Sequence, residues 1–301
     1  MISFLLIIIV SIVFQGIVIR TKSIASGRKG PGIFQPIKDI LKLFRKGSVF
    51  SETSSIIFQI APSIYFASVL MAISVLPLGT SKGIFSFEGD FVFFAYVLAL
   101  GKFFNIISAL DTGSSFEGMG ASREALFSML AEPAFFILMG SLSLLTGYTS
   151  FHEIFMALHF GSYISYAIGA IATFVLVMIC MIENSRMPVD DPKTHLELTM
   201  IHEVMILDNS GFDLGLILQA ANLKFALYGS LIANMFIGDL PLYYTIPLFL
   251  LMQFLFAVTV GLIESFFARF RMNHNAQFIL VLTSLSLLML FGILMLLGQF
   301  K

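Results

Sequence analysis

Eight apolar runs, each close to the length that crosses a lipid bilayer, divide this chain. A membrane-spanning helix needs about 20 mostly apolar residues, and few soluble folds could bury eight such runs. The first run has no basic residues before it and no small-residue cleavage site after it, so we expect a retained span rather than a signal peptide. The sequence predicts one all-α polytopic membrane domain over residues 1–301. The expected spans are 2–19, 56–78, 90–110, 124–146, 163–183, 217–236, 244–267 and 276–299.

Charged residues are too few for a water-facing surface. They make up 12% of the chain, whereas soluble domains carry roughly 25%. The formal net charge of −1 leaves no basic field for nucleic acid. The single cysteine, Cys180, excludes a disulfide framework and any zinc or iron–sulfur centre held by cysteines of this chain alone.

The basic residues indicate how the spans are oriented. Two connections are long, 20–55 and 184–216, and with eight spans they fall on one side of the membrane. That side holds thirteen Lys and Arg residues, and the other side holds two. The positive-inside rule therefore places both long loops in the cytoplasm and both termini outside. In a bacterial cell, this topology corresponds to the inner (cytoplasmic) membrane.

Several charged residues lie within the expected spans, where each costs about 2.5 to 3.5 kcal/mol near the bilayer centre. Such residues persist as ion pairs that fix helix packing or as groups along a hydrated path. Glu124 and Glu132 lie eight residues apart on one helix, so both can face the same side. We interpret Glu132, next to Pro133, as a hydrated functional carboxylate. For Arg123, Lys102 and Lys224 we favour a role as ion pairs that fix helix packing. The full set within the spans is Lys102, Glu124, Glu132, Glu183, Lys224 and Glu264.

The second long loop has helix-start chemistry at Asp191-Pro192 and closes at Gly211. A short helix between them would carry His195 and His202 on one face, together with Thr194, Glu197 and Glu203. Two histidines without further ligands do not make a metal site. A solvated helix face and a role in proton relay or partner contact remain open.

The first long loop predicts an amphipathic helix at the membrane interface. A turn-rich stretch, 27–32, is followed by Ile37, Ile40, Leu41 and Phe44 at helical spacing, with lysines among them. This pattern is typical of a helix lying at the headgroups of anionic lipid.

The motifs together resemble one known family. The run Arg28 to Gln35 with Asp39 to Leu43, the run Leu110 to Phe116, and Gly120 to Ala125 with Glu132-Pro133 are similar to the complex I subunit 1 family. Glu183, Arg186, Pro188 and Asp190, the Ser210-Gly211 ending and the Arg269/Arg271 pair extend the likeness over nearly the whole chain. The sequence looks closest to the hydrogenase-4 and formate hydrogenlyase branch, the membrane-bound group 4 NiFe hydrogenases.

This resemblance implies a subunit that docks a hydrophilic electron-transfer arm and couples it to proton or sodium movement. The implied partners are NiFe-hydrogenase-like large and small subunits, an iron–sulfur protein, antiporter-like membrane subunits and membrane lipid. The NiFe centre and iron–sulfur clusters would lie on those partners, and a bound quinone is possible. The implied ion-pathway residues are Glu124, Glu132, Glu183, Asp190, Glu197, Glu203, Lys224 and Glu264, and the implied docking residues are Arg28, Lys29, Gln35, Asp39, Arg123, Arg186, Arg269 and Arg271.

The chain departs from the family in its second long loop. Lys193 and His195 stand where the family usually has glutamates, so His195 and His202 are candidate titratable substitutes near neutral pH. This departure weakens the case for a conventional quinone-linked mechanism, although a quinone-site subunit of a respiratory oxidoreductase remains the alternative. A stand-alone secondary transporter is disfavoured, because such transporters usually contain internal repeats and none is detectable here.

Overall fold

The structure is a computed structural model, and it describes residues 1–158, 163–191 and 200–298. In this part of the chain, eight helices are long and apolar enough to cross a membrane, which confirms the all-α membrane fold. They are α1 (Ile2–Ala25), α3 (Ile56–Val75), α4 (Asp90–Asp111), α5 (Ser115–Thr146), α7 (Tyr163–Glu183), α9 (Gly211–Ile237), α10 (Leu242–Phe266) and α11 (Met272–Leu296).

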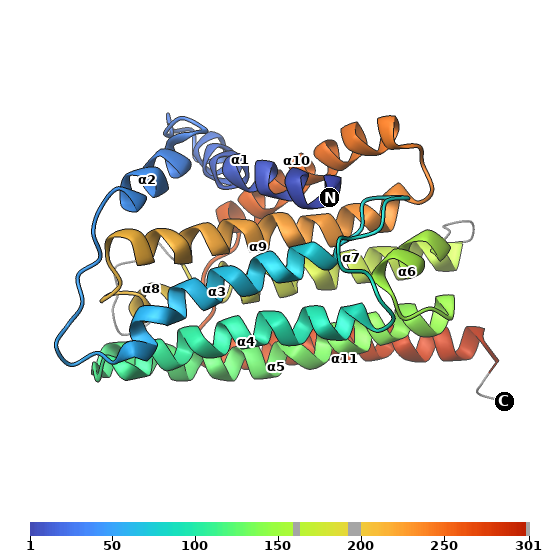
Figure 1. Cartoon of the computed structure of the whole chain (residues 1–301). Coiled ribbons are helices and arrows are strands. Elements are labelled where there is room, and N and C mark those ends of the chain that lie inside the picture. The colour runs from blue at the N-terminus through green and yellow to red at the C-terminus, as the bar shows by residue number, and fades with distance from the viewer. Residues whose placement is uncertain (159–162, 192–199, 299–301) are drawn as a thin grey trace.

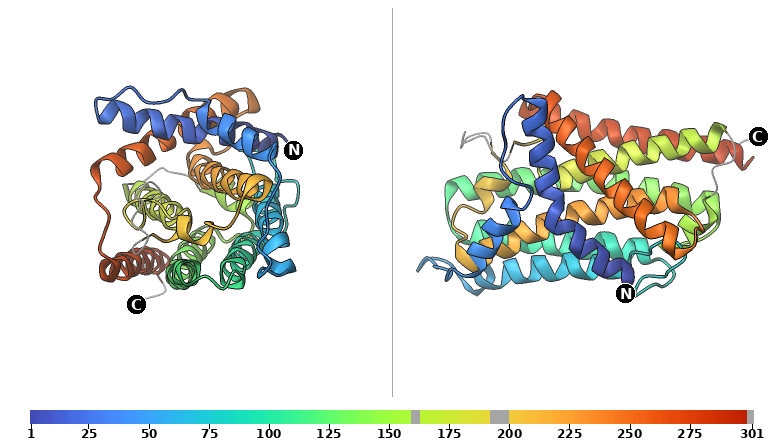
Figure 2. Two further views of the ribbon diagram at one scale, coloured as in Figure 1. Left: turned by 90° about the vertical axis from the view of Figure 1, so that its left-hand side faces the viewer. Right: turned by 90° about the horizontal axis from the view of Figure 1, so that it is seen from above.

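Helix α9 forms the centre of the bundle, and 83% of its most apolar window is buried. Helices α3 and α4 pack as a neighbouring pair, α5 lies between α4 and α11, and α1 and α10 pack together across α9 (Figures 1 and 2). We call the end of the bundle that carries the two long connections the loop end. The short helices α2 (Gln35–Phe44) and α8 (His202–Met205) lie there (Figure 1).

The expected spans are confirmed as helices, but several continue beyond the predicted edges toward the loop end, and three of them do so by six residues or more. Helix α5 begins at Ser115 rather than Glu124, α9 begins at Gly211 rather than at 217, and α1 continues to Ala25 rather than ending at 19. The early turns of α5 are polar, so apolarity alone could not detect them. They are stable because they pack on protein: Gly120 lets the helix approach Ile201 and Met205 of the α8 segment.

Helix α2 is present and amphipathic, as the spacing predicts, but its apolar face packs on protein. Ile40 is buried, and the ring of Phe44 lies 5.4 Å from that of Phe212 on α9. Gly215 leaves room for Phe44 at this contact. Leu41 and the lysines remain exposed. The helix is therefore fixed to the bundle, with its charged face outward.

A further short helix, α6 (Phe151–Ala157), was not predicted and lies at the opposite end. It is attached by Asp90, which is fully buried at the first turn of α4. The Asp90 carboxylate accepts hydrogen bonds from the Phe151 backbone N–H at 2.7 Å and from the Ser150 hydroxyl at 3.1 Å. Asp90 thus acts as a structural clamp between two connections far apart in the sequence.

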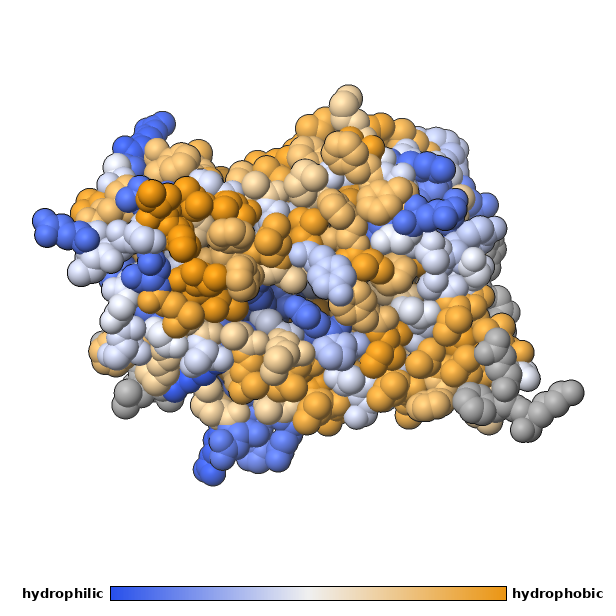
Figure 3. Space-filling view, turned by 60° about the horizontal axis from the view of Figure 1, so that its bottom comes forward, coloured by the Kyte–Doolittle hydropathy of each residue, from blue (hydrophilic) through white to orange (hydrophobic). Residues whose placement is uncertain are grey.

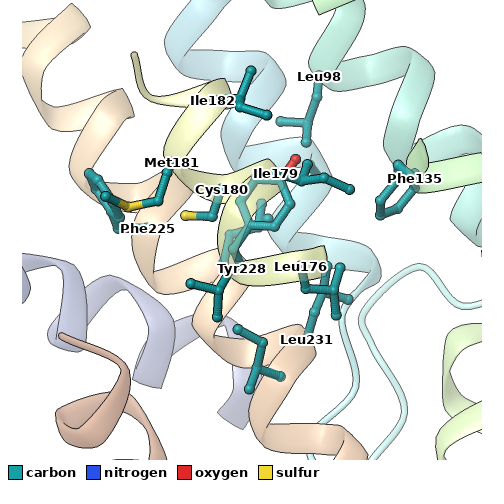
Figure 4. Close-up of a cluster of buried hydrophobic side chains, with 14 of the residues drawn as sticks. Leu98, Phe135, Leu176, Ile179, Cys180, Met181, Ile182, Phe225, Tyr228 and Leu231 are labelled. Carbon is teal, nitrogen blue, oxygen red and sulfur yellow. The ribbon is translucent and has the colours of Figure 1, made fainter. Parts of the chain in front are cut away.

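An apolar layer fills the middle of the bundle between α4, α5, α7 and α9. Leu98, Phe135, Leu176, Ile179 and Leu231 lie close together there (Figure 4). Cys180 is fully buried among these side chains, where it packs as a small apolar residue.

Candidate functional site

Four charged side chains from four helices meet at the loop-end side of the apolar layer. The Lys102 Nζ on α4 lies 3.1 Å from Glu124 Oε1 on α5 and 2.9 Å from Glu183 Oε2 on α7. The Lys224 Nζ on α9 lies 3.2 Å from the same Glu183 oxygen. We call these four residues the charged network. It joins two lysines to two carboxylates, so its formal charge is balanced.

The network is buried, and its surroundings supply further polar contacts. The Ser185 hydroxyl donates to Glu124 Oε2 at 2.7 Å, and Lys224 Nζ donates to the Glu183 backbone carbonyl at 2.7 Å. The Lys224 ammonium also lies 5.7 Å from the centre of the Tyr65 ring, a cation–π distance. Buried charges are tolerated when they are paired and hydrogen-bonded in this way. Pairing therefore accounts for the persistence of these residues inside spans.

A second cluster lies beside the network, where α1 and α10 end. The Glu264 carboxylate, almost wholly buried, lies 2.8 Å from Lys22 Nζ and 3.2 Å from Arg186 Nη1. The Arg186 guanidinium also lies 5.2 Å from the centre of the Phe225 ring on α9. One carboxylate thus pairs with two cations from distant parts of the chain. Lys22 was not among the residues predicted from the sequence.

A third cluster is centred on Asp190 in the second long loop. Its carboxylate lies 2.8 Å from Arg269 Nη2 and accepts hydrogen bonds from the backbone N–H groups of Ile201 and His202 at 3.0 and 3.2 Å. Burial raises the pKa of Asp190, while Arg269 and the backbone donors oppose that shift.

Residues 184–190 connect all three clusters. Ser185 contacts Glu124 of the charged network, Arg186 contacts Glu264, and Asp190 contacts Arg269. The Asn275 side-chain amide adds a hydrogen bond to the Val189 carbonyl at 3.1 Å. A displacement of this short segment would therefore change the three clusters together.

Glu132 differs from the other carboxylates because its side chain is exposed on the outer face of α5. It has no ion pair within the residues that the structure describes. Glu132, Lys102 and Glu183 line a small, partly open cavity of about 40 Å³, room enough for water in a polar site. Glu132 and Lys102 also line a lateral crevice of about 490 Å³ between α4 and α5. The face formed by these helices shows hydrophilic surface set among hydrophobic surface (Figure 3).

The predicted docking residues divide into internal and exposed groups. Three have internal partners: Arg123 donates to the Met200 carbonyl at 3.1 Å, and Arg186 and Arg269 pair with Glu264 and Asp190. The others lie at the loop-end surface, where the Gln35 amide donates to Asp39 at 2.8 Å. Arg28, Lys29 and Arg271 are exposed.

Some predicted residues cannot be placed in the site. His195, Glu197 and Lys193 lie outside the described residues. Glu203, on α8, is partly exposed. In contrast, Glu117 was not singled out by sequence, although its carboxylate accepts a hydrogen bond from the Asp208 backbone N–H at 3.0 Å and so ties α5 to the second loop. Its position in the first turn of a helix was the available signal.

Among the described residues, no group of three or more His, Cys, Asp and Glu side chains could hold a metal ion. Burial lowers the pKa of His202 to about 4. Glu124 opposes this shift, and the nearby cations Lys224, Arg186 and Lys102 add to it. The imidazole is therefore neutral near physiological pH.

We predict that His202→Gln leaves the pH dependence of activity unchanged between about pH 6 and pH 8, because His202 does not titrate there. Below that range, an unfolded histidine takes up a proton near about pH 6.5 before the folded one does. The fold around α8 should therefore lose stability as the pH falls from about 6.5 toward 4, and His202→Gln should remove that loss. Activity profiles and thermal melting at each pH measure both effects. A wild-type activity step near neutrality that disappears in the variant would contradict the prediction.

Comparison with known proteins agrees with this geometry. The family model described as NADH dehydrogenase matches residues 1–294. The chain belongs to the NADH dehydrogenase family. Hydrogenase-4 component C of Escherichia coli K12 is 33% identical over 74% of this chain and 70% of its own length. Formate hydrogenlyase subunit 4 of the same organism is 27% identical over 79% of this chain and 75% of its own length.

A solved structure has the same fold as this NADH dehydrogenase family member. It is a chain of the membrane-bound sulfane sulfur reductase, an archaeal respiratory membrane complex, with a TM-score of 0.81 and 21% identity. The match covers 97% of this chain and 98% of that one. The chain is thus a multi-pass membrane protein of the type found in complex I-like and hydrogenase-type complexes.

Proposed function

We propose that this chain is the ion-coupling membrane subunit of a hydrogenase-4-type redox complex in the cytoplasmic membrane. The observation that carries the proposal is the buried charged network, which ends beside a cavity and a lateral crevice at Glu132. The similarity to hydrogenase-4 component C and formate hydrogenlyase subunit 4 supports this assignment.

The loop end is the proposed docking surface for the hydrophilic arm. Residues there, among them the partly exposed Gln35 and the exposed Asp39 and Arg271, can contact NiFe-hydrogenase-like large and small subunits and an iron–sulfur protein. Arg123, Arg186 and Arg269 contribute indirectly, because their internal contacts fix the segments that form this surface. Movement of residues 184–190 on docking or electron transfer would change the charged network through Ser185.

The route for an ion is lateral in this proposal. In this proposal, ions do not pass along the bundle through the apolar layer drawn in Figure 4. The cavity lined by Lys102, Glu183 and Glu132 shares two of these residues, Lys102 and Glu132, with the crevice between α4 and α5, so the two spaces are neighbours. A bare carboxylate facing lipid is costly, so Glu132 is expected to face a neighbouring antiporter-like subunit that receives the proton or sodium ion.

Glu132→Gln tests the proposal. Removing the titratable group should slow ion movement by about 100-fold or more, the lower end of what a positioned proton-transfer group contributes, and should therefore lower the number of ions moved per electron. The subunit should still assemble, because Glu132 has no ion pair within the described residues. Ion movement into vesicles containing the whole complex, followed with a pH-sensitive dye or radioactive sodium, measures the ratio.

The matched control is Glu88→Gln, which neutralises an exposed carboxylate near the opposite end. It should leave the ratio unchanged. A Glu132→Gln complex that moves as many ions per electron as the wild type would refute the role of this residue.

Quinone reduction is the second candidate reaction, favoured by the NADH dehydrogenase family match. A purified complex that reduces a soluble quinone, and evolves no hydrogen, would select it over the hydrogenase reaction. Purification of this chain alone as an active ion carrier would overturn both.

A further inference from the structure

A separate cavity opens at the loop end, between the last turns of α1 and α10 and the chain that follows α1. Its volume is about 530 Å³. Three cationic side chains line it, Lys22, Arg28 and Lys29, together with apolar groups that include Ile19, Pro31 and Phe266. The ion route proposed above does not use this cavity.

The cavity carries net positive charge. Glu264 is the one carboxylate among its lining residues, and it is already paired with both Lys22 and Arg186. Arg28 and Lys29 are exposed and have no ion pair within the described part of the chain. Two unpaired cations at the mouth of a cavity are the chemistry that binds a phosphate group.

The surroundings favour a lipid phosphate over a free one. The two helices that border the cavity expose large apolar side chains beside it: Ile24 on α1 is 67% exposed and Phe266 on α10 is 78% exposed. Both helices end here, so the cavity lies where a span leaves the bilayer. Exposed apolar side chains beside a basic cavity match the two parts of a phospholipid. Its phosphate would bind in the cavity, and its acyl chains would lie along α1 and α10.

We propose that this cavity binds the phosphate of an anionic phospholipid such as phosphatidylglycerol, with Arg28 and Lys29 as its recognition residues. Lys22 also lines the cavity, and its ion pair with Glu264 keeps its side chain in place there. This assigns Arg28 and Lys29 to lipid rather than to the hydrophilic partner that the family resemblance implies. Basic pockets between spans on the cytoplasmic side are a recurring form of lipid recognition.

The test compares the double variant Arg28→Gln/Lys29→Gln with Lys38→Gln/Lys46→Gln in the assembled complex. The control removes two exposed charges from the same loop that do not line the cavity. Each complex is delipidated, titrated with vesicles of phosphatidylglycerol or phosphatidylcholine, and washed. Retained lipid is then counted by phosphorus analysis and native mass spectrometry.

We expect wild type and control to retain phosphatidylglycerol but not phosphatidylcholine, and the Arg28/Lys29 variant to bind it at least about tenfold more weakly. Ser26→Asp, which adds an anion to the cavity lining and keeps both cations, should weaken binding as well. Equal retention by the Arg28/Lys29 variant, or equal retention of the two lipids, would overturn the proposal. Displacement of the lipid by inorganic phosphate at equal concentration would indicate a free-phosphate site instead. Redox activity and ion movement are measured separately, so this result does not depend on the proposed function.

Discussion

Glu183→Gln is expected to destabilise the subunit by about 3 to 5 kcal/mol, the usual cost of removing one partner from a buried ion pair. The Glu183 side chain balances Lys102 and Lys224 at 2.9 and 3.2 Å, and both lysines are buried. A neutral amide would leave the network with two ammonium groups and only Glu124 to compensate them. The thermal melting of the purified complex, and the fraction of subunit that assembles in the membrane, measure the loss.

Two further variants test whether the loss of stability at Glu183→Gln comes from the unbalanced charge. Glu183→Gln/Lys224→Met removes one charge of each sign and leaves Lys102 paired with Glu124 at 3.1 Å, so it should recover much of the stability. Glu132→Gln removes a carboxylate without an ion pair in the described chain and should melt like the wild type. If Glu183→Gln also melted like the wild type, the four residues would not form the interdependent network described above.

Glu264→Gln is expected to have the second largest effect on stability, about 2 kcal/mol, in the range for a hydrogen bond between charged groups. The cost is smaller than at Glu183 because Lys22 is 24% exposed and can turn toward water. The change should loosen the packing of α1 on α10. It should also free the Arg186 side chain, so that the 184–190 segment is held less firmly. Limited proteolysis of the complex between residues 26 and 34, together with thermal melting, tests this.

Ser265→Ala is the matched control for that variant. Its hydroxyl donates to the Gly261 carbonyl of its own helix at 2.7 Å, and it has no side-chain bond to another helix among the described residues, so its loss should cost little. Proteolysis of Glu264→Gln at the wild-type rate would show that the Lys22–Glu264–Arg186 cluster does not hold α1 in place.

Much of the fold could be predicted because hydrophobic length alone identifies a span. The edges could not, because polar turns such as those around Glu117 and Gly120 become stable only where α8 and the second loop cover them. Lys22, although counted among the basic loop residues, gave no sign of its pairing with Glu264.

The site was predicted as a set of residues but not as an arrangement. Sequence shows that Lys102, Glu124, Glu183 and Lys224 are costly where they stand, and therefore that they need partners. It cannot show that one carboxylate serves two lysines, since those contacts join helices far apart in the chain. The exposure of Glu132, on the same helix as buried Glu124, likewise depends on how α5 is rotated against α4.

The Asp190 carboxylate holds together the two ends of the stretch that contains residues 192–199, since it accepts hydrogen bonds from Asp191 as well as from Ile201 and His202. Ile201 and His202 are thereby kept next to residues 184–190, whose Ser185 and Arg186 contact Glu124 and Glu264. One carboxylate therefore sets the position at which the chain returns to the bundle after residue 199, and it does so beside the charged network.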